Sequence, residues 1–201
     1  MKAIVLAGGL GTRLYPTTNA INKHLFPLYN KPLIYYPLSV IFLAKIKDIL
    51  IILNQSDYKL FYKLLGDGKQ FGVTITYAFQ ENPNGIAEAF KIGKNFIGKS
   101  DVCLILGDNI FFGQGFLDKI NEAKKRLERK KMSTIFAYRV NNPNEYGIVS
   151  FDKYNNAIHL DEKPKNPKSN FAVTGLYFFD NSVVNKVQRI KKSKRNELEI
   201  T

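Results

Sequence analysis

The amino-acid sequence predicts an α/β protein: a mostly parallel sheet with helices on both faces, and a small mixed or antiparallel extension after residue 140. Two observations support this prediction. Short β-rich apolar segments alternate with longer segments of helical spacing, which is typical of strands joined by helical crossovers. These β-rich segments are also apolar almost throughout, as expected for strands that are buried on both faces.

Each element follows from its local pattern. Apolar β-rich runs predict strands at residues 3–7, 48–53, 73–79, 102–106 and 133–140. Helical spacing predicts helices at residues 32–45, 58–65, 85–96 and 116–130. After residue 140 the segments YGIVSFD, AIHLDEKP and FAVTGLYFFD are strands joined by turns rich in Asn, Lys and Pro. No repeat or flexible linker interrupts this order, so we expect residues 1–201 to form a single domain with a Rossmann-like sheet.

The formal net charge of +13 raises the question of an anionic partner. Much of the excess lies in two runs, residues 124–131 and 191–195, which are interpreted as solvated helix faces or connectors. Because no DNA-reading motif accompanies them, we expect no nucleic-acid partner, although a basic nucleic-acid-binding protein remains an alternative. An anionic small-molecule substrate explains part of the charge equally well.

The sequence also indicates where in the cell the protein is expected and what role its cysteine has. No apolar run is long enough to cross a bilayer, and the N-terminus lacks a signal peptide's cleavage pattern, so we expect a cytoplasmic protein without a membrane partner. Cys103 is the only cysteine, which excludes an intrachain disulfide. Its apolar surroundings, DVCLIL, predict a packed core thiol and not a nucleophile.

The segment LAGGLGTRLYP (residues 6–16) directly follows the first predicted strand. Ligands of open parallel sheets bind beyond the carboxyl ends of the strands, where glycines allow backbone N–H groups to approach an anion. Arg13 adds a planar cation that matches phosphate geometry. The segment completes neither a dinucleotide-binding fingerprint, because Leu14 occupies the last glycine position, nor a P-loop. From these glycines alone, a phosphate-binding loop and a plain tight turn both remain open.

A longer match favours phosphate binding. AGGLGTRLYPTTNAINKHLFPLYNKP resembles the opening of the sugar nucleotidyltransferase family, with its AGG-x-GTRL-x-P-x-T…K pattern. The segments NKPLIYYPLS, LGDNIFFG, YGIVSFD, EKPKNPKSNFAVTGLYFFD and NELEIT resemble members that use dTTP and glucose 1-phosphate. The resemblance covers essentially the whole chain. It implies Mg²⁺-assisted in-line attack of the sugar phosphate on the α-phosphorus of dTTP, giving dTDP-glucose and pyrophosphate.

The resemblance also implies roles for individual residues. Arg13 and Lys23 are the implied catalytic cations. The implied nucleotide-binding residues are Leu6, Gly8, Gly9, Gly11, Thr12, Arg13, Gln80, Pro83 and Gly85. Gln80 offers an acceptor and donors suited to the imide edge of thymine or uracil. Two positions depart from the family pattern: His24 stands where we expect glutamine and receives no catalytic role, and Asn84 stands where we expect aspartate.

The remaining implied sites concern the metal and the sugar. Asp108, directly after a predicted strand, would hold Mg²⁺. The implied sugar-phosphate residues are Leu106, Tyr146, Gly147, Glu162, Lys163 and Val173. Neighbours in a regular strand point to opposite faces, so Glu162 and Lys163 can reach one ligand only if the strand ends there, at Pro164 or a bulge. Plainer interpretations stay open: a solvated lysine for Lys23, turns or loops for GDN and NPNG, and an exposed pair for Glu162 and Lys163.

The resemblance stops at NELEIT. In the family, this run is followed by a strand with a second metal-binding aspartate and by helices that form homo-oligomer contacts. We therefore expect a shortened member with reduced or lost activity, in which those oligomer contacts are missing. Two alternatives follow: a non-catalytic fragment that binds nucleotide or sugar phosphate, and a uridylyltransferase that uses UTP.

Overall fold

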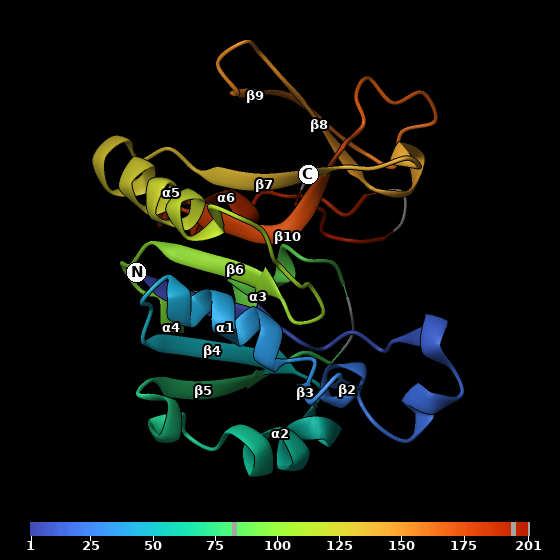
Figure 1. The fold of residues 1–201 in the computed structure, drawn as a ribbon, viewed down its shortest axis with the longest axis vertical. Coiled ribbons are helices and arrows are strands. Elements are labelled where there is room, and N and C mark those ends of the chain that lie inside the picture. The colour runs from blue at the N-terminus through green and yellow to red at the C-terminus, as the bar shows by residue number, and fades with distance from the viewer. Residues whose placement is uncertain (82–83, 194–195, 201) are drawn as a thin grey trace.

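The computed structural model describes residues 1–81, 84–193 and 196–200, and a single large sheet forms its centre (Figure 1). Among these residues the sheet has eight strands, in the order β5-β4-β1-β6-β10-β8-β9, with β7 alongside β10. The strands are β1 Lys2–Leu6, β4 Asp48–Leu53, β5 Thr74–Phe79, β6 Val102–Leu106, β7 Thr134–Arg139, β8 Gly147–Phe151, β9 Ala157–Glu162 and β10 Phe171–Phe179. A separate hairpin pairs β2 Pro27–Leu28 with β3 Lys31–Pro32.

The sheet has a parallel half and an antiparallel half. Strand β1 runs parallel to β4 and β6, and β4 runs parallel to β5. Strand β10 then reverses direction beside β6, and its other pairings, with β7 and β8, are antiparallel as well. The α/β class with a mixed extension is thus confirmed. The strand expected at 133–140 follows a helix as predicted, but it pairs with β10 in the antiparallel half.

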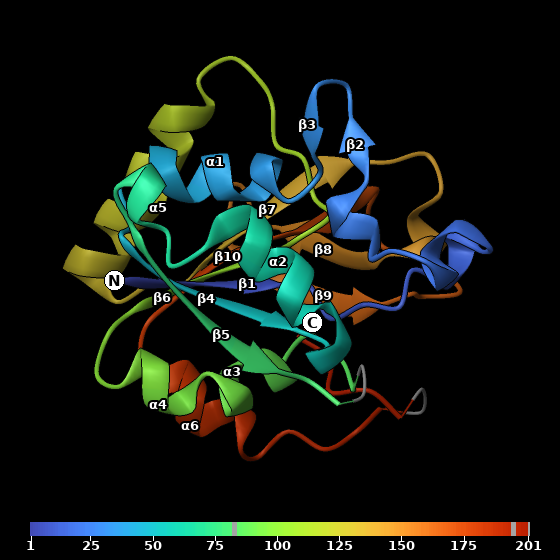
Figure 2. The same cartoon turned by 90° about the horizontal axis from the view of Figure 1, so that it is seen from below.

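Helices cover both faces of the sheet, as predicted (Figure 2). Helices α1 Tyr35–Leu43, α2 Tyr58–Leu65 and α5 Phe116–Lys130 pack on one face, and α3 Glu88–Ile92, α4 Lys94–Ile97 and α6 Ser182–Val187 pack on the other. Strand β1 shows why both faces need cover: Ala3 and Val5 belong to the first buried cluster, and Ile4 belongs to the second. Side chains of a strand alternate between faces, so a fully apolar strand requires an apolar layer on each side.

The helix expected at residues 85–96 is divided at Gly93 into α3 and α4. A Cβ atom at Gly93 would lie 2.7 Å from Cδ1 of Ile4, so the glycine allows the backbone to approach the sheet closely. Helix α6 was not among the predicted elements. It buries Val183, Val184 and Val187 on the face that α3 and α4 also cover.

Cys103 is fully buried in β6, and burial raises the pKa of its thiol to about 12. The prediction of a packed core thiol is confirmed. In the part of the chain that the structure describes, no helix combines the length and apolar character needed to cross a membrane.

Candidate active site

The candidate site lies at the carboxyl edge of the parallel half, where β1 and β6 end side by side. Leu6 and Leu106 are opposite each other in the parallel register. Just beyond them, the Gly107 N–H donates to the carbonyl of Leu6 at 2.9 Å, and the Ala7 N–H donates to Ile52 at 2.7 Å. The first bond continues the β1–β6 pairing by one residue and holds the starts of the two loops together, and the second ties the start of the β1 loop to β4.

The glycines after β1 allow close contacts that a side chain would prevent. A Cβ at Gly8 would lie 2.8 Å from Oε1 of Gln80, closer than real Cβ contacts allow. Gly9 faces Lys23, whose Nζ would be 3.6 Å from such a Cβ. Gly11 has a φ of 64°, which favours glycine, at the start of the short turn Thr12–Leu14. The loop therefore brings its backbone directly against Gln80 and Lys23.

Lys23 and Asp108 form an ion pair at this edge and are both partly buried. Asn109 braces the carboxylate, because its Nδ2 donates to Asp108 at 3.0 Å while its Oδ1 accepts from the Gly175 N–H on β10. Burial alone would raise the pKa of Asp108, but the hydrogen bond and charge of Lys23 outweigh it and hold that pKa below its usual value. The site thus keeps an ionised carboxylate beside a cation.

His24 is buried directly behind this pair and is bonded to Asn22. The Asn22 side-chain oxygen accepts from the backbone N–H of His24 at 3.0 Å and lies 2.6 Å from its Nδ1. The amide nitrogen of Asn22 donates to Asp57 at 2.7 Å, which leaves its oxygen as the acceptor for the ring N–H. Burial, followed by the charge of Lys23, lowers the pKa of His24 from 6.5 to about 4. The ring is therefore neutral at neutral pH, as a packed histidine without a catalytic role should be.

Gln80, Asn84 and Glu88 form a second cluster, at the end of β5 and the start of α3. Both amide groups donate to the Glu88 carboxylate, Gln80 at 2.5 Å and Asn84 at 2.9 Å. Gln80 is 5% exposed, so this bond is well shielded from water. The adjacent Gly85 has a φ of 106°, and a Cβ there would lie 2.5 Å from the carbonyl oxygen of Leu198. The chain near its C-terminal end thus packs against the segment expected to contact the base.

The expected sugar residues lie on β8, β9 and β10. Gly147 is opposite Glu162 in the β8–β9 register, and the Lys163 N–H donates to the Tyr146 carbonyl at 3.0 Å. Strand β9 ends at Glu162, and Lys163 has a φ of 45°, so the regular alternation stops between the two residues. The condition under which both residues could reach one ligand is therefore met.

Val173 is half-buried on β10, in the stretch that precedes Gly175. Burial and then the charge of Glu162 raise the pKa of Tyr177 on the same strand. Gly147 and Glu162 thus pair across β8 and β9, and Val173 lies on β10, the strand that also contacts Asn109 through Gly175.

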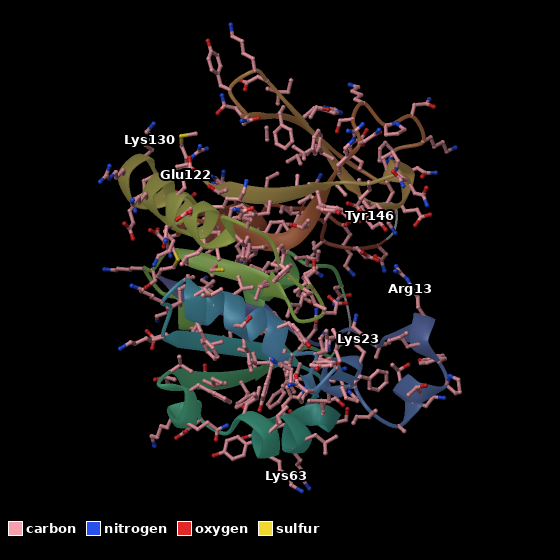
Figure 3. The ribbon with its side chains drawn as sticks, in the orientation of Figure 1. Arg13, Lys23, Lys63, Glu122, Lys130 and Tyr146 are labelled. Carbon is pink, nitrogen blue, oxygen red and sulfur yellow. The ribbon has the colours of Figure 1, made fainter. Side chains whose placement is uncertain are left out.

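Arg13 and Tyr146 lie farther from the Lys23–Asp108 pair. Figure 3 shows Arg13 out on the loop that projects from the carboxyl edge, with Lys23 closer to the sheet and Tyr146 on the antiparallel half. Both Arg13 and its neighbour Thr12 are exposed, and among the described residues Arg13 makes no ion pair. Pro83 lies outside the described residues. The structure therefore brings together Gly8, Gly9, Lys23, Gln80 and Asp108, and leaves Arg13 at a distance.

Sequence reasoning missed four residues that build this site: Asn22, Glu88, Asn109 and Leu198. Asn22 and Asn109 are direct neighbours of recognised residues, in NKH and GDN, and that proximity is the signal that could have found them. Glu88 and Leu198 carry no comparable local signal, because their partners come from other parts of the chain.

We expect Gly175→Ala to lower the free energy of unfolding by about 1–3 kcal/mol, as overpacking does. The new Cβ would lie 2.6 Å from Cγ of Leu106 and 2.8 Å from Oδ1 of Asn109. Gly9→Ala is the matched control, because its Cβ would meet only the end of Lys23 at an ordinary distance, and we expect a change within about 0.5 kcal/mol. Urea denaturation measures both, and equal losses would contradict the close approach at Gly175.

Comparison with known proteins shows the family of this chain. The nucleotidyl transferase family matches residues 2–201. The chain is 52% identical over 201 residues to a glucose-1-phosphate thymidylyltransferase of Neisseria meningitidis serogroup A, covering all of this chain and 69% of that protein. A protein of the same name from Mycobacterium tuberculosis is 51% identical, again over the whole chain and 68% of its own length.

Solved structures show the same fold. A Bacillus anthracis protein described as a glucose-1-phosphate thymidylyltransferase, crystallised with sucrose, superposes with a TM-score of 0.89 at 37% identity. The alignment covers all of this chain and 80% of that one. A UDP-glucose pyrophosphorylase complexed with UDP-glucose, at 22% identity and a TM-score of 0.84 over the whole chain and 83% of its own, shares the fold. With a family match across residues 2–201 and 52% identity to a named relative, this chain belongs to the nucleotidyl transferase family.

Proposed function

We propose that this protein transfers a nucleotidyl group from dTTP to glucose 1-phosphate, forming dTDP-glucose and releasing pyrophosphate. The names of its relatives support the reaction. The observation that carries the proposal is the meeting of three features at one sheet edge: the glycine loop after β1, the ammonium of Lys23 and the carboxylate of Asp108. Backbone amides, a cation and a carboxylate that could hold a metal are what a site for two phosphate compounds requires.

The reaction is chiefly a problem of charge. A phosphate oxygen of glucose 1-phosphate attacks the α-phosphorus of dTTP, and the bond to the departing pyrophosphate breaks. Two anions must meet in line, so neutralisation and alignment matter more than proton transfer. In this proposal Lys23 and the glycine amides contact the polyphosphate, and Arg13 braces the triphosphate and the leaving pyrophosphate.

Asp108 would hold a Mg²⁺ ion through its carboxylate. Its carboxylate is held ionised by Lys23, and the described part of the chain has no group of three or more His, Cys, Asp or Glu placed so that it could hold a metal ion. Mg²⁺ commonly takes one or two carboxylates and completes its shell with phosphate oxygens and water. When bound, the ion would polarise the phosphoryl oxygens as a Lewis acid.

The remaining residues are assigned to the sugar phosphate and to the nucleotide. Glu162 would accept hydrogen bonds from the glucose hydroxyls, and Lys163 would pair with the sugar phosphate. Leu106, Tyr146, Gly147 and Val173 would line that pocket. Leu6, Gly8, Gly11, Thr12, Pro83 and Gly85 would contact the nucleotide, with Gln80 at the imide edge of the base. Thymine and uracil share this edge, so UTP is the competing nucleotide.

The direct test measures pyrophosphate release by the 201-residue chain from dTTP, glucose 1-phosphate and Mg²⁺, with UTP assayed in parallel. We expect release that depends on both substrates and is faster with dTTP. Calorimetric binding of dTTP without product would contradict transfer and favour a nucleotide-binding role. Faster release with UTP would overturn the assignment of dTTP.

We expect Arg13→Ala to lower kcat/KM about 10²-fold, the magnitude typical of removing one group that stabilises developing charge. The matched control is Arg126→Ala, because Arg126 is an exposed arginine of α5 that pairs with Glu122 away from the sheet edge. Steady-state kinetics with dTTP measure both variants. An unchanged Arg13→Ala enzyme would remove Arg13 from the catalytic set.

A further inference from the structure

The amide of Gln80 has a fixed orientation, and Glu88 is the reason. A carboxylate only accepts hydrogen bonds, so the amide group that faces it must present its nitrogen. The Gln80 nitrogen does so, donating to Oε2 of Glu88 at 2.5 Å. The opposite orientation would place two acceptor oxygens against each other in a buried position, where unsatisfied polar contacts are costly.

The carbonyl oxygen of Gln80 consequently faces the glycine loop. Its Oε1 is the atom nearest to the position of a Cβ on Gly8, at 2.8 Å. The second oxygen of Glu88 is engaged as well, because it accepts from Asn84 at 2.9 Å. With both oxygens in use and Gln80 only 5% exposed, the cluster resists rotation of the amide.

We propose that Glu88 is a specificity-determining positioning residue: it holds Gln80 as a hydrogen-bond acceptor and so selects nucleotides whose base presents an N–H donor. This inference rests on the proposed function, in which Gln80 meets the base. Thymine and uracil carry a proton on N3, whereas cytosine carries a lone pair there. An amide oxygen held in place accepts a hydrogen bond from the N3–H of thymine or uracil. The same oxygen is repelled by the N3 lone pair of cytosine.

The test compares dUTP with dCTP, since the two nucleotides differ at the imide edge and share the absence of the methyl group. Binding of each to the wild type and to Glu88→Gln is measured by calorimetry. Glutamine can donate or accept at this position, so it permits either orientation of Gln80. We expect the Kd of dCTP divided by the Kd of dUTP to be about tenfold lower in Glu88→Gln than in the wild type, the equivalent of roughly one hydrogen bond.

Glu81→Gln is the matched control. Glu81 is exposed, adjacent to Gln80, and loses the same charge without touching the amide. We expect Glu81→Gln to leave the Kd of dCTP divided by the Kd of dUTP unchanged. An equal fall of this ratio in Glu81→Gln would mean that the lost charge, and not the orientation of Gln80, sets the preference for dUTP over dCTP. That result would overturn the inference.

A double-mutant cycle separates a positioning role from a structural one. If Glu88 acts through Gln80, then Glu88→Gln added to Gln80→Ala produces no further change in the ratio. Circular dichroism confirms that each variant is folded. Failure of the wild type to bind dUTP and dTTP would refute the proposed function itself, whereas wild-type selectivity retained in Glu88→Gln would refute only the role of Glu88.

Discussion

Lys23→Met is expected to lower the rate of nucleotidyl transfer about 10³-fold, at the upper end of what loss of one electrostatic contact costs an enzyme. The Lys23 ammonium faces Gly9 and pairs with Asp108, so it lies between the glycine loop and the carboxylate assigned to the metal. Methionine keeps an unbranched apolar side chain and removes the charge. Steady-state measurement of pyrophosphate release from dTTP and glucose 1-phosphate checks the loss.

Lys63→Met is the control for Lys23→Met, because Lys63 is an exposed lysine of α2 that Figure 3 shows at the bottom of the molecule, below Lys23 and on the outer side of the helix. We expect its activity to match the wild type. Urea denaturation of both variants distinguishes lost chemistry from lost folding. A folded Lys23→Met protein with more than a tenth of wild-type activity would be incompatible with the proposed role of Lys23.

Acidification from pH 6.5 to 4 is expected to remove about 3 kcal/mol of stability through His24 alone, because its pKa is lowered from 6.5 to about 4 by burial. Above pH 6.5 the ring is neutral in both the folded and the unfolded protein, and its contribution is fully present. Below pH 6.5 the His24 ring binds a proton in the unfolded chain but stays neutral in the folded protein. Stability therefore falls until the pH reaches the pKa of His24 in the folded protein. Urea denaturation at intervals of pH measures this slope.

The chain's other histidine provides the control for the acid effect. His24→Gln removes the titrating ring, so the free energy of unfolding should change less between pH 6.5 and 4. His159→Gln replaces a side chain that is 41% exposed, and this variant should keep the pH dependence of the wild type. The pKa of Asp108 is lowered below its ordinary value of 3.8, so its own loss of stability comes at lower pH. If the free energy of unfolding of His24→Gln still fell between pH 6.5 and 4 as in the wild type, other groups would be responsible for the acid sensitivity.

The sequence determined the elements that depend on local pattern. Strand β6 was predicted with the bounds that the structure has, and so were α2 and α5, because apolar periodicity reflects which side chains face the core. It also predicted the carboxyl edge as the site of the glycine loop, since the order of strand and loop is local information. The resemblance to a family, which spans the whole chain, pointed to Lys23 and Asp108 as functional residues.

Only the tertiary structure decided which of these residues meet. Lys23 and Asp108 are 85 positions apart, and their contact exists because β1 and β6 are neighbours in the sheet. The partner of β7, the packing of Leu198 against Gly85, and the bond from Gln80 to Glu88 were likewise absent from the predictions. Periodicity records whether a residue is buried, but the identity of its neighbour depends on how distant elements pack together, and no local pattern carries that information.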